Sequence, residues 1–263
     1  MIHRSFRESS LALQVINKKL EEAIQIRDDF LSIASHELRT PLTPLKMRLE
    51  LIQRLAHQPS TQSQSPTQSP TKDESQSKIL TNVEICLSSL ERICHLIDEL
   101  LTVSKIRIGQ LSLNREEVEL CALVKRVVEY YQPDLERKKC PVELHLDPPI
   151  LGHWDPWRLE EVVVNLLTNA IKFNGGHVIE IRINQQGKDA KLSIRDHGIG
   201  IAPKDQLRIF QRFERAVSFT QFGGFGLGLY ITRQIIEANG GTIQLESELC
   251  KGSLFTVLIP LSL

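Results

Sequence analysis

Residues 156–173 read PWRLEEVVVNLLTNAIKF, and this stretch decides the fold of the second half of the chain. At about 100° per residue, five of its polar side chains lie on one narrow stripe of a helix. They are Arg158, Glu161, Asn165, Asn169 and Lys172. Most of the remaining circumference is apolar, so the helix must be largely buried. We therefore expect it to lie inside a globular domain.

The composition of this stripe favours a ligand over solvent. A solvated edge is the commoner explanation for a polar stripe, but such an edge usually carries Glu, Lys or Gln. Asn165 and Asn169 are instead poor helix formers. Amide oxygens suit Mg²⁺, and the ammonium group of Lys172 supplies positive charge for phosphate. The stripe therefore predicts a magnesium and phosphate site.

Two glycine-rich turns follow that helix. Residues 196–200 read DHGIG after an apolar strand pattern. Glycine there lets the backbone approach a flat ligand, and Asp196 can accept a hydrogen bond from an exocyclic amine such as adenine N6. Residues 223–229 read GGFGLGL and lead into a helix whose free amides form an anion site. The glycine spacing does not fit a Rossmann fingerprint.

A histidine motif lies in the first helix, where residues 30–43 read FLSIASHELRTPLT. His36 is two residues from Ala34 on the apolar seam, so we expect it to face outward. Glu37 adjoins it, Thr40 lies one turn later, and Pro41 removes a helical hydrogen bond just beyond. A lone surface histidine usually has no function. An exposed imidazole beside a carboxylate on a weakened helix, however, suits a nucleophile that a moving partner reaches.

Two long helical patterns surround a polar stretch at 57–78, HQPSTQSQSPTQSPTKDESQSK, which we expect to be a flexible loop. Apolar residues at alternating spacings of three and four predict a seam on each helix. They are Leu13, Ile16, Leu20, Ala23, Phe30 and Ala34 before the loop, and Leu80, Val83, Leu87, Leu90, Cys94, Ile97, Leu101 and Ser104 after it. Two helices cannot enclose their own apolar stripe, so an antiparallel hairpin predicts a homodimeric four-helix bundle.

After Gly109 the pattern changes to short mixed elements, which predicts a separate α/β domain over 110–263. Strand patterns cover 116–120, 142–146, 178–184, 191–195, 242–246 and 254–259. Helical patterns cover 120–138, 156–173 and 227–239. The expected organisation is thus a coiled-coil helix over 1–29, a hairpin over 30–109 and the α/β domain.

Composition excludes several classes of protein. The 263 residues carry 32 Lys and Arg against 32 Asp and Glu, so no basic field attracts nucleic acid or an anionic membrane. Aromatic residues, at 5%, are sparse for a stacking surface. The five cysteines form no C-x-x-C pair and indicate reduced thiols. No apolar run is long enough to span a bilayer, so we expect a cytoplasmic chain without a membrane segment.

Five motifs resemble, in order, the H, N, G1, F and G2 boxes of two-component sensor histidine kinases. They are SHELRTPLT at 35–43, NLLTNAIKF at 165–173, DHGIG at 196–200, IFQRF at 209–213 and GFGLGL at 224–229. The ending GSLFTVLIP at 252–260 is similar to the last strand of that family. The resemblance implies a hairpin for dimerisation and histidine phosphotransfer, followed by a Bergerat-type ATP-binding α/β sandwich.

The resemblance also implies roles in nucleotide binding. Asn165 and Asn169 would serve Mg²⁺-ATP, with Asn169 as the metal ligand, Lys172 on phosphate and Asp196 reading adenine. Phe210 and Phe213 would anchor a lid over 216–223. The glycines that would shape the pocket and its lid are Gly198, Gly200, Gly224, Gly226 and Gly228. His197 replaces the more usual Asn and Phe225 a frequent Thr, and neither has an assigned role at this stage.

The same resemblance implies the chemistry. His36 would attack the γ-phosphorus of ATP, Glu37 would accept or polarise its proton, and the phosphoryl group would pass to an aspartate of a response regulator receiver domain. Thr40 would orient water when the hairpin dephosphorylates its regulator. The length of the loop leaves open whether a subunit phosphorylates itself or its mate.

Two alternatives remain open from the sequence. One is a catalytically silent dimeric adaptor that binds nucleotide or regulator. The other is an ATP-driven conformational machine of the gyrase or chaperone type, which would not need SHELRTPLT. Because no sensor pattern precedes the seam, we expect the stimulus to arrive through a separate sensor protein or a region upstream of Met1.

Overall fold

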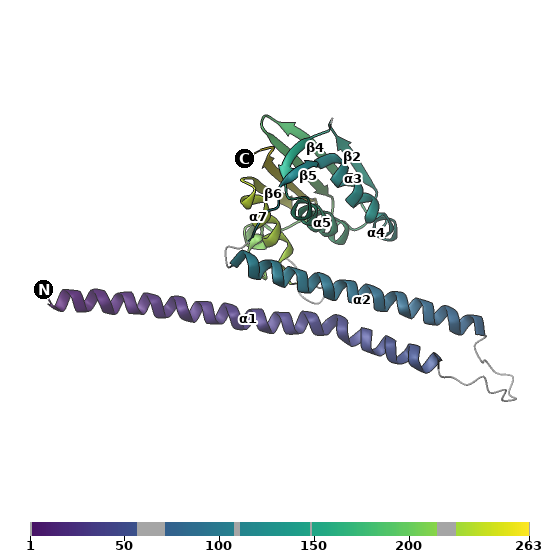
Figure 1. The fold of residues 1–263 in the computed structure, drawn as a ribbon, viewed down its shortest axis with the longest axis horizontal. Coiled ribbons are helices and arrows are strands. Elements are labelled where there is room, and N and C mark those ends of the chain that lie inside the picture. The colour runs from purple at the N-terminus through teal and green to yellow at the C-terminus, as the bar shows by residue number, and fades with distance from the viewer. Residues whose placement is uncertain (1, 57–71, 108–110, 148, 215–224, 263) are drawn as a thin grey trace. The chain divides into compact units, whose positions relative to one another are not determined.

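The computed structural model describes residues 2–56, 72–107, 111–147, 149–214 and 225–262 (Figure 1). In α1 the side chains are described from Leu31 onward, together with Asn17 and Ile24. Most of the expected α1 seam therefore lies outside the described side chains. The chain divides into two compact units, Met1–Ile97 and Asp98–Leu263, and each is described by itself.

Two long helices form the hairpin, α1 over Ile2–Ala56 and α2 over Lys72–Arg107. Helix α1 continues through Pro41 and Pro44, although each ring removes a backbone donor. Helix α2 begins at Lys72, so the expectation that residues 72–78 belong to a loop is wrong. Lys, Glu and Gln in this stretch are good helix formers. Residues 57–71 lie outside the described part.

The two helices pack through residues spaced three or four apart. The buried residues include Ala34, Glu37, Pro41 and Leu45 on α1 and Asn82, Cys86 and Leu96 on α2. The Nη1 atom of Arg48 donates to Oδ1 of Asn82 at 2.8 Å across this contact. The seam predicted on α2 is a neighbouring stripe that stays exposed within one chain, with Leu80, Leu87, Leu90 and Leu101 on the surface. Periodicity finds apolar stripes but does not tell which neighbour each one faces.

The second unit is built on a five-stranded sheet in the order β2-β4-β5-β7-β6. Only the β2–β4 pair is parallel among these pairings. The strands are β2 Val142–Leu146, β4 Ile179–Gln186, β5 Asp189–Asp196, β6 Thr242–Glu248 and β7 Gly252–Pro260. A small antiparallel sheet pairs β1, Glu116–Glu119, with β3, Leu151–Trp154. The expected α/β fold after a helical hairpin is confirmed.

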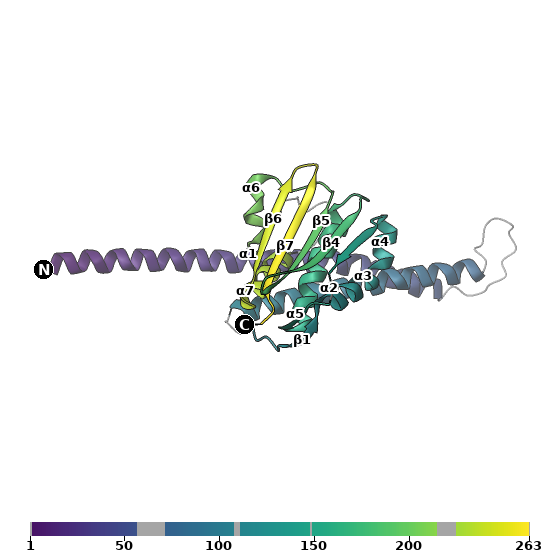
Figure 2. The same cartoon turned by 90° about the horizontal axis from the view of Figure 1, so that it is seen from above.

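Helices cover one face of this sheet (Figure 2). They are α3 Leu120–Tyr130, α4 Gln132–Lys138, α5 Pro156–Phe173 and α7 Gly228–Ala238, with a short α6, Pro203–Gln206, and a 3₁₀ turn, Arg208–Phe210. Alternate strand residues such as Ile181 and Ile194 are buried on this face. Their neighbours Glu180, Arg182 and Arg195 lie on the other face, which we call the open face. Alternation thus separates an apolar layer from a charged one.

The element bounds expected from the sequence agree with the structure in part. The bounds of α5 and β2 are as expected. The helix expected over 120–138 is broken at Tyr131, because Pro133 has no amide proton to continue α3 and lies in the first turn of a new helix, α4. Strand β3 was not expected, since Leu151–Trp154 is four residues long and contains Gly152.

All five cysteines are free thiols, and Cys86, Cys121 and Cys140 are buried. Among the described residues, no helix is both long enough and apolar enough to cross a bilayer.

Candidate functional site

Helix α5 carries the polar stripe as expected, but the stripe has two parts. In its first turns the Nη1 atom of Arg158 lies 2.7 Å from Oε2 of Glu161, so these two charges neutralise each other. Asn165 is buried, while Asn169 and Lys172 are half-buried further along the same face. The Nζ atom of Lys172 lies 5.1 Å from the centroid of the Phe173 ring. The second half of the helix carries two amides and one ammonium group.

The turn after β5 lies against the end of α5. The amide of Gly198 donates to Oδ1 of Asp196 at 2.9 Å, and the amide of Ile199 donates to the carbonyl of Phe173 at 3.3 Å. A methyl group on Gly198 would lie 2.0 Å from the same carbonyl oxygen, so only glycine fits there. We call residues 196–200 the acidic turn. This contact joins it to the last turn of α5, which carries Lys172.

Asp196 is the buried acid of this turn. Burial raises its pKa above the ordinary value, although hydrogen bonds from Gly198 and Ser253 act in the opposite direction. A buried carboxylate at a glycine turn offers a directional acceptor, and its ionised form is the one that accepts from an amine. Asp196 therefore has the chemistry expected of a group that reads an exocyclic amine.

The second glycine turn meets α5 at Asn165. Gly228 begins α7, and a methyl group on it would lie 2.7 Å from Oδ1 of Asn165. Gly226 has a left-handed φ of 71°. Phe225 is buried, so the departure from the usual Thr places an aromatic ring in the core. Gly224 and the expected lid at 216–223 lie outside the described residues.

The aromatic segment is fixed to the core and to α7. The rings of Phe210 and Phe255 meet edge to face with centroids 6.4 Å apart. The Nη2 atom of Arg212 donates to the hydroxyl of Tyr230 at 2.7 Å, and the guanidinium lies over that ring. Phe213 has a left-handed φ of 64°, which is uncommon for a bulky residue. These contacts hold Phe210 and Arg212 against β7 and α7.

The histidine motif lies in the hairpin. The side chain of His36 is 71% exposed, whereas that of the adjacent Glu37 is 3% exposed. Nδ1 of His36 lies 3.9 Å from Oε1 of Glu37, and Nη2 of Arg92, on α2, lies 3.9 Å from Oε2. The hydroxyl of Thr40 donates to the carbonyl of His36 at 3.0 Å. The outward orientation of His36 is confirmed. The burial of Glu37 was not predicted from the sequence.

The predicted residues therefore form two groups. Asn165, Asn169, Lys172, the acidic turn and Gly226–Gly228 come together around α5, while His36, Glu37 and Thr40 lie on the hairpin. Sequence reasoning missed Arg92 and Asn174. Asn174 precedes two glycines and looks like an ordinary turn residue, and nothing in the sequence pairs Arg92 with Glu37.

The arrangement around α5 can bind an adenine nucleotide with a divalent cation. No group of three or more His, Cys, Asp or Glu side chains with metal-ligand geometry occurs among the described residues. The donors available are amide oxygens, which suit Mg²⁺ only when the nucleotide's phosphates supply further oxygens. The residues present fit a metal that arrives with its nucleotide.

Two family models match the chain. Residues 154–263 match the family described as histidine kinase-, DNA gyrase B- and HSP90-like ATPase. Residues 26–109 match the His Kinase A (phospho-acceptor) domain.

Individual proteins show the same relationship. The chain is 32% identical over 256 residues to sensor histidine kinase RcsC of Escherichia coli, covering 95% of this chain and 25% of RcsC. It is 32% identical over 240 residues to the circadian input-output histidine kinase CikA of Synechococcus elongatus, covering 89% and 30%. The solved Acinetobacter baumannii histidine kinase AdeS is 30% identical with a TM-score of 0.62, covering 86% of this chain and 98% of AdeS. The chain thus spans less than a third of the length of RcsC and CikA.

The close approach at Gly198 predicts a large stability effect. Gly198→Ala should lower the free energy of unfolding of the second unit by about 3 kcal/mol, because the new methyl group displaces α5 or the turn. Gly187→Ala is the control, since nothing lies within 4 Å of its added methyl group and its left-handed φ of 65° leaves only backbone strain. It should cost only about 1 kcal/mol.

Urea unfolding followed by tryptophan fluorescence measures both variants. Both tryptophans of the chain, Trp154 and Trp157, lie in this unit. Equal losses in the two variants would contradict a backbone contact at Gly198.

Proposed function

Because this chain belongs to the two-component sensor histidine kinases, we propose that it transfers the γ-phosphoryl group of ATP to His36 and from there to an aspartate of a response regulator. The observation that carries the proposal is that one chain has both features: an exposed imidazole next to a buried carboxylate, and a site around α5 whose residues suit a nucleotide. The relatives are much longer than this chain, so the activity, substrate and partners are proposals for this chain itself.

In the nucleotide half, Asp196 accepts from adenine N6 and Lys172 contacts phosphate. Asn165 and Asn169 face the same side of α5, with Asn169 as the metal ligand. Gly198, Gly200, Gly224, Gly226 and Gly228 shape the pocket, and Phe213 anchors its lid. Bound Mg²⁺ would offset the charge that develops on the phosphate oxygens. The positive charge that binds phosphate comes from a few groups at the site and not from a basic surface, which agrees with a net charge of zero for the chain.

In the phosphoryl half, His36 is the nucleophile. Nδ1 lies 3.9 Å from Oε1 of Glu37, too far for a direct hydrogen bond, and Nε2 supplies the lone pair that attacks. A bond forms between Nε2 and the γ-phosphorus while the bond from that phosphorus to the β–γ bridging oxygen breaks. ADP leaves with that electron pair, and Glu37 accepts or polarises the proton of the imidazole. The product is a phosphohistidine, which an aspartate carboxylate of the regulator then attacks.

Thr40 supports a second activity, hydrolysis of the phosphorylated regulator. Its side chain is exposed one turn from His36, and its hydroxyl donates back to the helix. The hydroxyl oxygen keeps lone pairs with which to orient water. We therefore assign kinase and regulator phosphatase activity to the same hairpin.

Homodimerisation follows from the unpartnered stripes of the hairpin. Leu31, Leu42 and Leu49 lie within about 20° of one another around α1 and are all exposed in one chain. The seam of α2 is exposed likewise. A second copy would cover both stripes in a four-helix bundle, as isologous association requires.

The silent adaptor is the competing function, and labelling separates it from the kinase. With γ-labelled ATP and Mg²⁺ the chain should acquire a label that acid removes and base does not. His36→Gln should lower the label at least about 100-fold, because no other group replaces the nucleophile. His95→Gln, which changes an exposed histidine of α2, should leave it unchanged.

Two results would contradict the kinase. A label that survives acid or persists in His36→Gln would place the phosphate on another residue. Nucleotide binding without any label would favour the adaptor.

The dimer is tested by one leucine of the α1 stripe. Leu42→Glu should weaken self-association at least about 100-fold in sedimentation equilibrium, because the symmetric contact buries the change twice. Met47→Glu is the control, since Met47 is exposed on the same helix about 140° away from Leu42. Equal weakening by both changes, or by neither, would argue against this stripe as the interface.

The raised pKa of Asp196 predicts a pH dependence specific to adenine. An adenine amine favours the ionised carboxylate, so ADP should bind most tightly above the pKa of the free protein's Asp196. Affinity should fall as the pH drops through that raised pKa, by up to about tenfold per pH unit. Calorimetric titrations over this range measure it. Inosine diphosphate, which has the same phosphates but no amine, should show a weaker dependence, and identical curves would contradict the assignment.

A further inference from the structure

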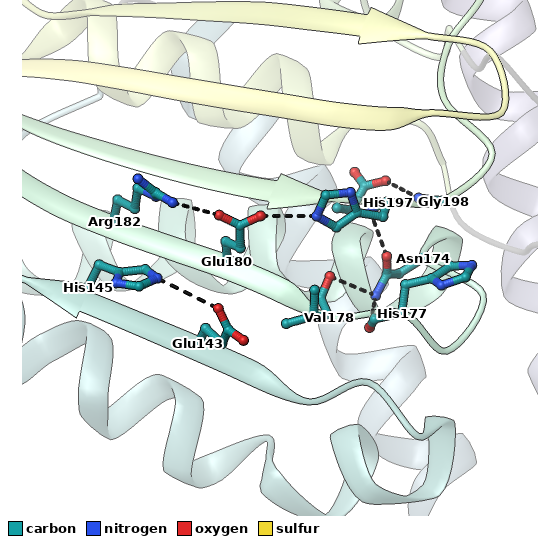
Figure 3. Close-up of polar contacts among 10 residues, drawn as sticks. Glu143, His145, Asn174, His177, Val178, Glu180, Arg182, His197 and Gly198 are labelled. Atoms are coloured by element: carbon teal, nitrogen blue, oxygen red, sulfur yellow. Dashed lines mark hydrogen bonds and ion pairs between the residues drawn. The ribbon is translucent and has the colours of Figure 1, made fainter.

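A second set of contacts holds the acidic turn from the open face of the sheet (Figure 3). Nε2 of His197 lies 3.0 Å from Oε1 of Glu180, on the neighbouring strand β4. Oε2 of Glu180 accepts from Nη2 of Arg182 at 2.9 Å. Because successive residues of a strand face opposite sides, Asp196 faces the helices while the next residue faces the open side.

The charge state of Glu180 fixes the direction of this bond. The hydrogen bond from Arg182, followed by the one from His197, lowers the pKa of Glu180. A carboxylate only accepts hydrogen bonds, so Nε2 of His197 carries the proton. A charge-assisted bond of this kind is stronger than a neutral one.

The main chain of His197 is held as firmly as its ring. Its amide donates to Oδ1 of Asn174 at 2.8 Å, directly after the end of α5. Asn174 is fully buried, and its Nδ2 donates to the carbonyls of His177 and Val178. Those bonds fix the amide orientation, so Oδ1 must face the acidic turn. His197 is thus clamped by Asn174 at its backbone and by Glu180 at its ring.

We propose that Glu180 and His197 form a strut that positions the acidic turn for nucleotide binding from the opposite face of the sheet. Both are positioning residues, because they act on the nucleotide only through the backbone of Asp196 and Gly198. The strut gives a purpose to His197, which stands where the family usually has Asn. The link to nucleotide rests on the proposed function.

The same sheet face supplies a matched control. Nε2 of His145 lies 3.7 Å from Oε2 of Glu143, both on β2 (Figure 3). This pair has the same chemistry but both side chains are more than half exposed and neither belongs to the acidic turn. Glu180 has two register partners on the neighbouring strands, Glu143 on β2 and Arg195 on β5. Any general effect of charge on the open face should therefore appear in both pairs.

The experiment measures ADP affinity by calorimetry and the Gly198 amide by nitrogen-15 NMR without nucleotide. Glu180→Ala and His197→Ala should each weaken ADP binding about five- to tenfold and shift the Gly198 amide. The double variant should be no weaker than the more affected single one, since the two act as a unit. Glu180→Gln keeps an acceptor oxygen and should restore most of the affinity. Glu143→Ala and His145→Ala should change neither readout.

The same variants separate binding from chemistry. In the labelling reaction the KM for ATP should rise while the rate at saturating ATP stays unchanged, which a general loss of structure would not produce. An unmoved Gly198 amide, an additive double variant or an equal effect of the β2 pair would overturn the strut. A wild-type chain that binds no adenine nucleotide would overturn the proposed function instead, and the amide shift would still decide the strut.

Discussion

The backbone contact between Gly198 and the carbonyl of Phe173 is the constraint on which the nucleotide site depends. It brings the end of β5 against the end of α5, with no room for even a methyl group. Without it, Asp196 at the end of β5 would not be held beside the last turn of α5, which carries Lys172. The opposite end of the site uses the same device, since Gly228 lets the start of α7 approach Asn165. Both glycine turns are therefore required for packing.

This packing places a carboxyl group where water is scarce. Burial raises the pKa of Asp196, so keeping it ionised near neutral pH opposes folding. Below its ordinary value the group is neutral in both states, and its unfavourable contribution appears as the pH rises towards the raised pKa. Hydrogen bonds from Gly198 and Ser253 compensate in part. A site with this cost is typical of function, because an apolar residue would pack there more easily.

Much of this arrangement follows from the sequence, and the missing parts have physical reasons. The wide apolar arc of residues 156–173 gave the bounds of α5, because burial on nearly all sides leaves few alternatives. Strand β3 was missed since it is short and pairs with β1 from far along the chain. The α2 stripe that packs within the hairpin was missed because two apolar stripes lie side by side. Glu180 alternates like any strand residue, so only the fold shows that it meets His197.

In the hairpin, two consecutive residues, His36 and Glu37, have opposite environments. Consecutive residues of a helix differ by about 100°, so His36 can face solvent while Glu37 faces α2. The proposed nucleophile must stay accessible, whereas the carboxylate beside it must stay fixed. Burial and the nearby guanidinium of Arg92 fix that carboxylate. The environment of His36 therefore depends on both helices, because Arg92 of α2 lies 3.9 Å from the carboxylate beside the imidazole. A shift of α2 along α1 would change the surroundings of that carboxylate.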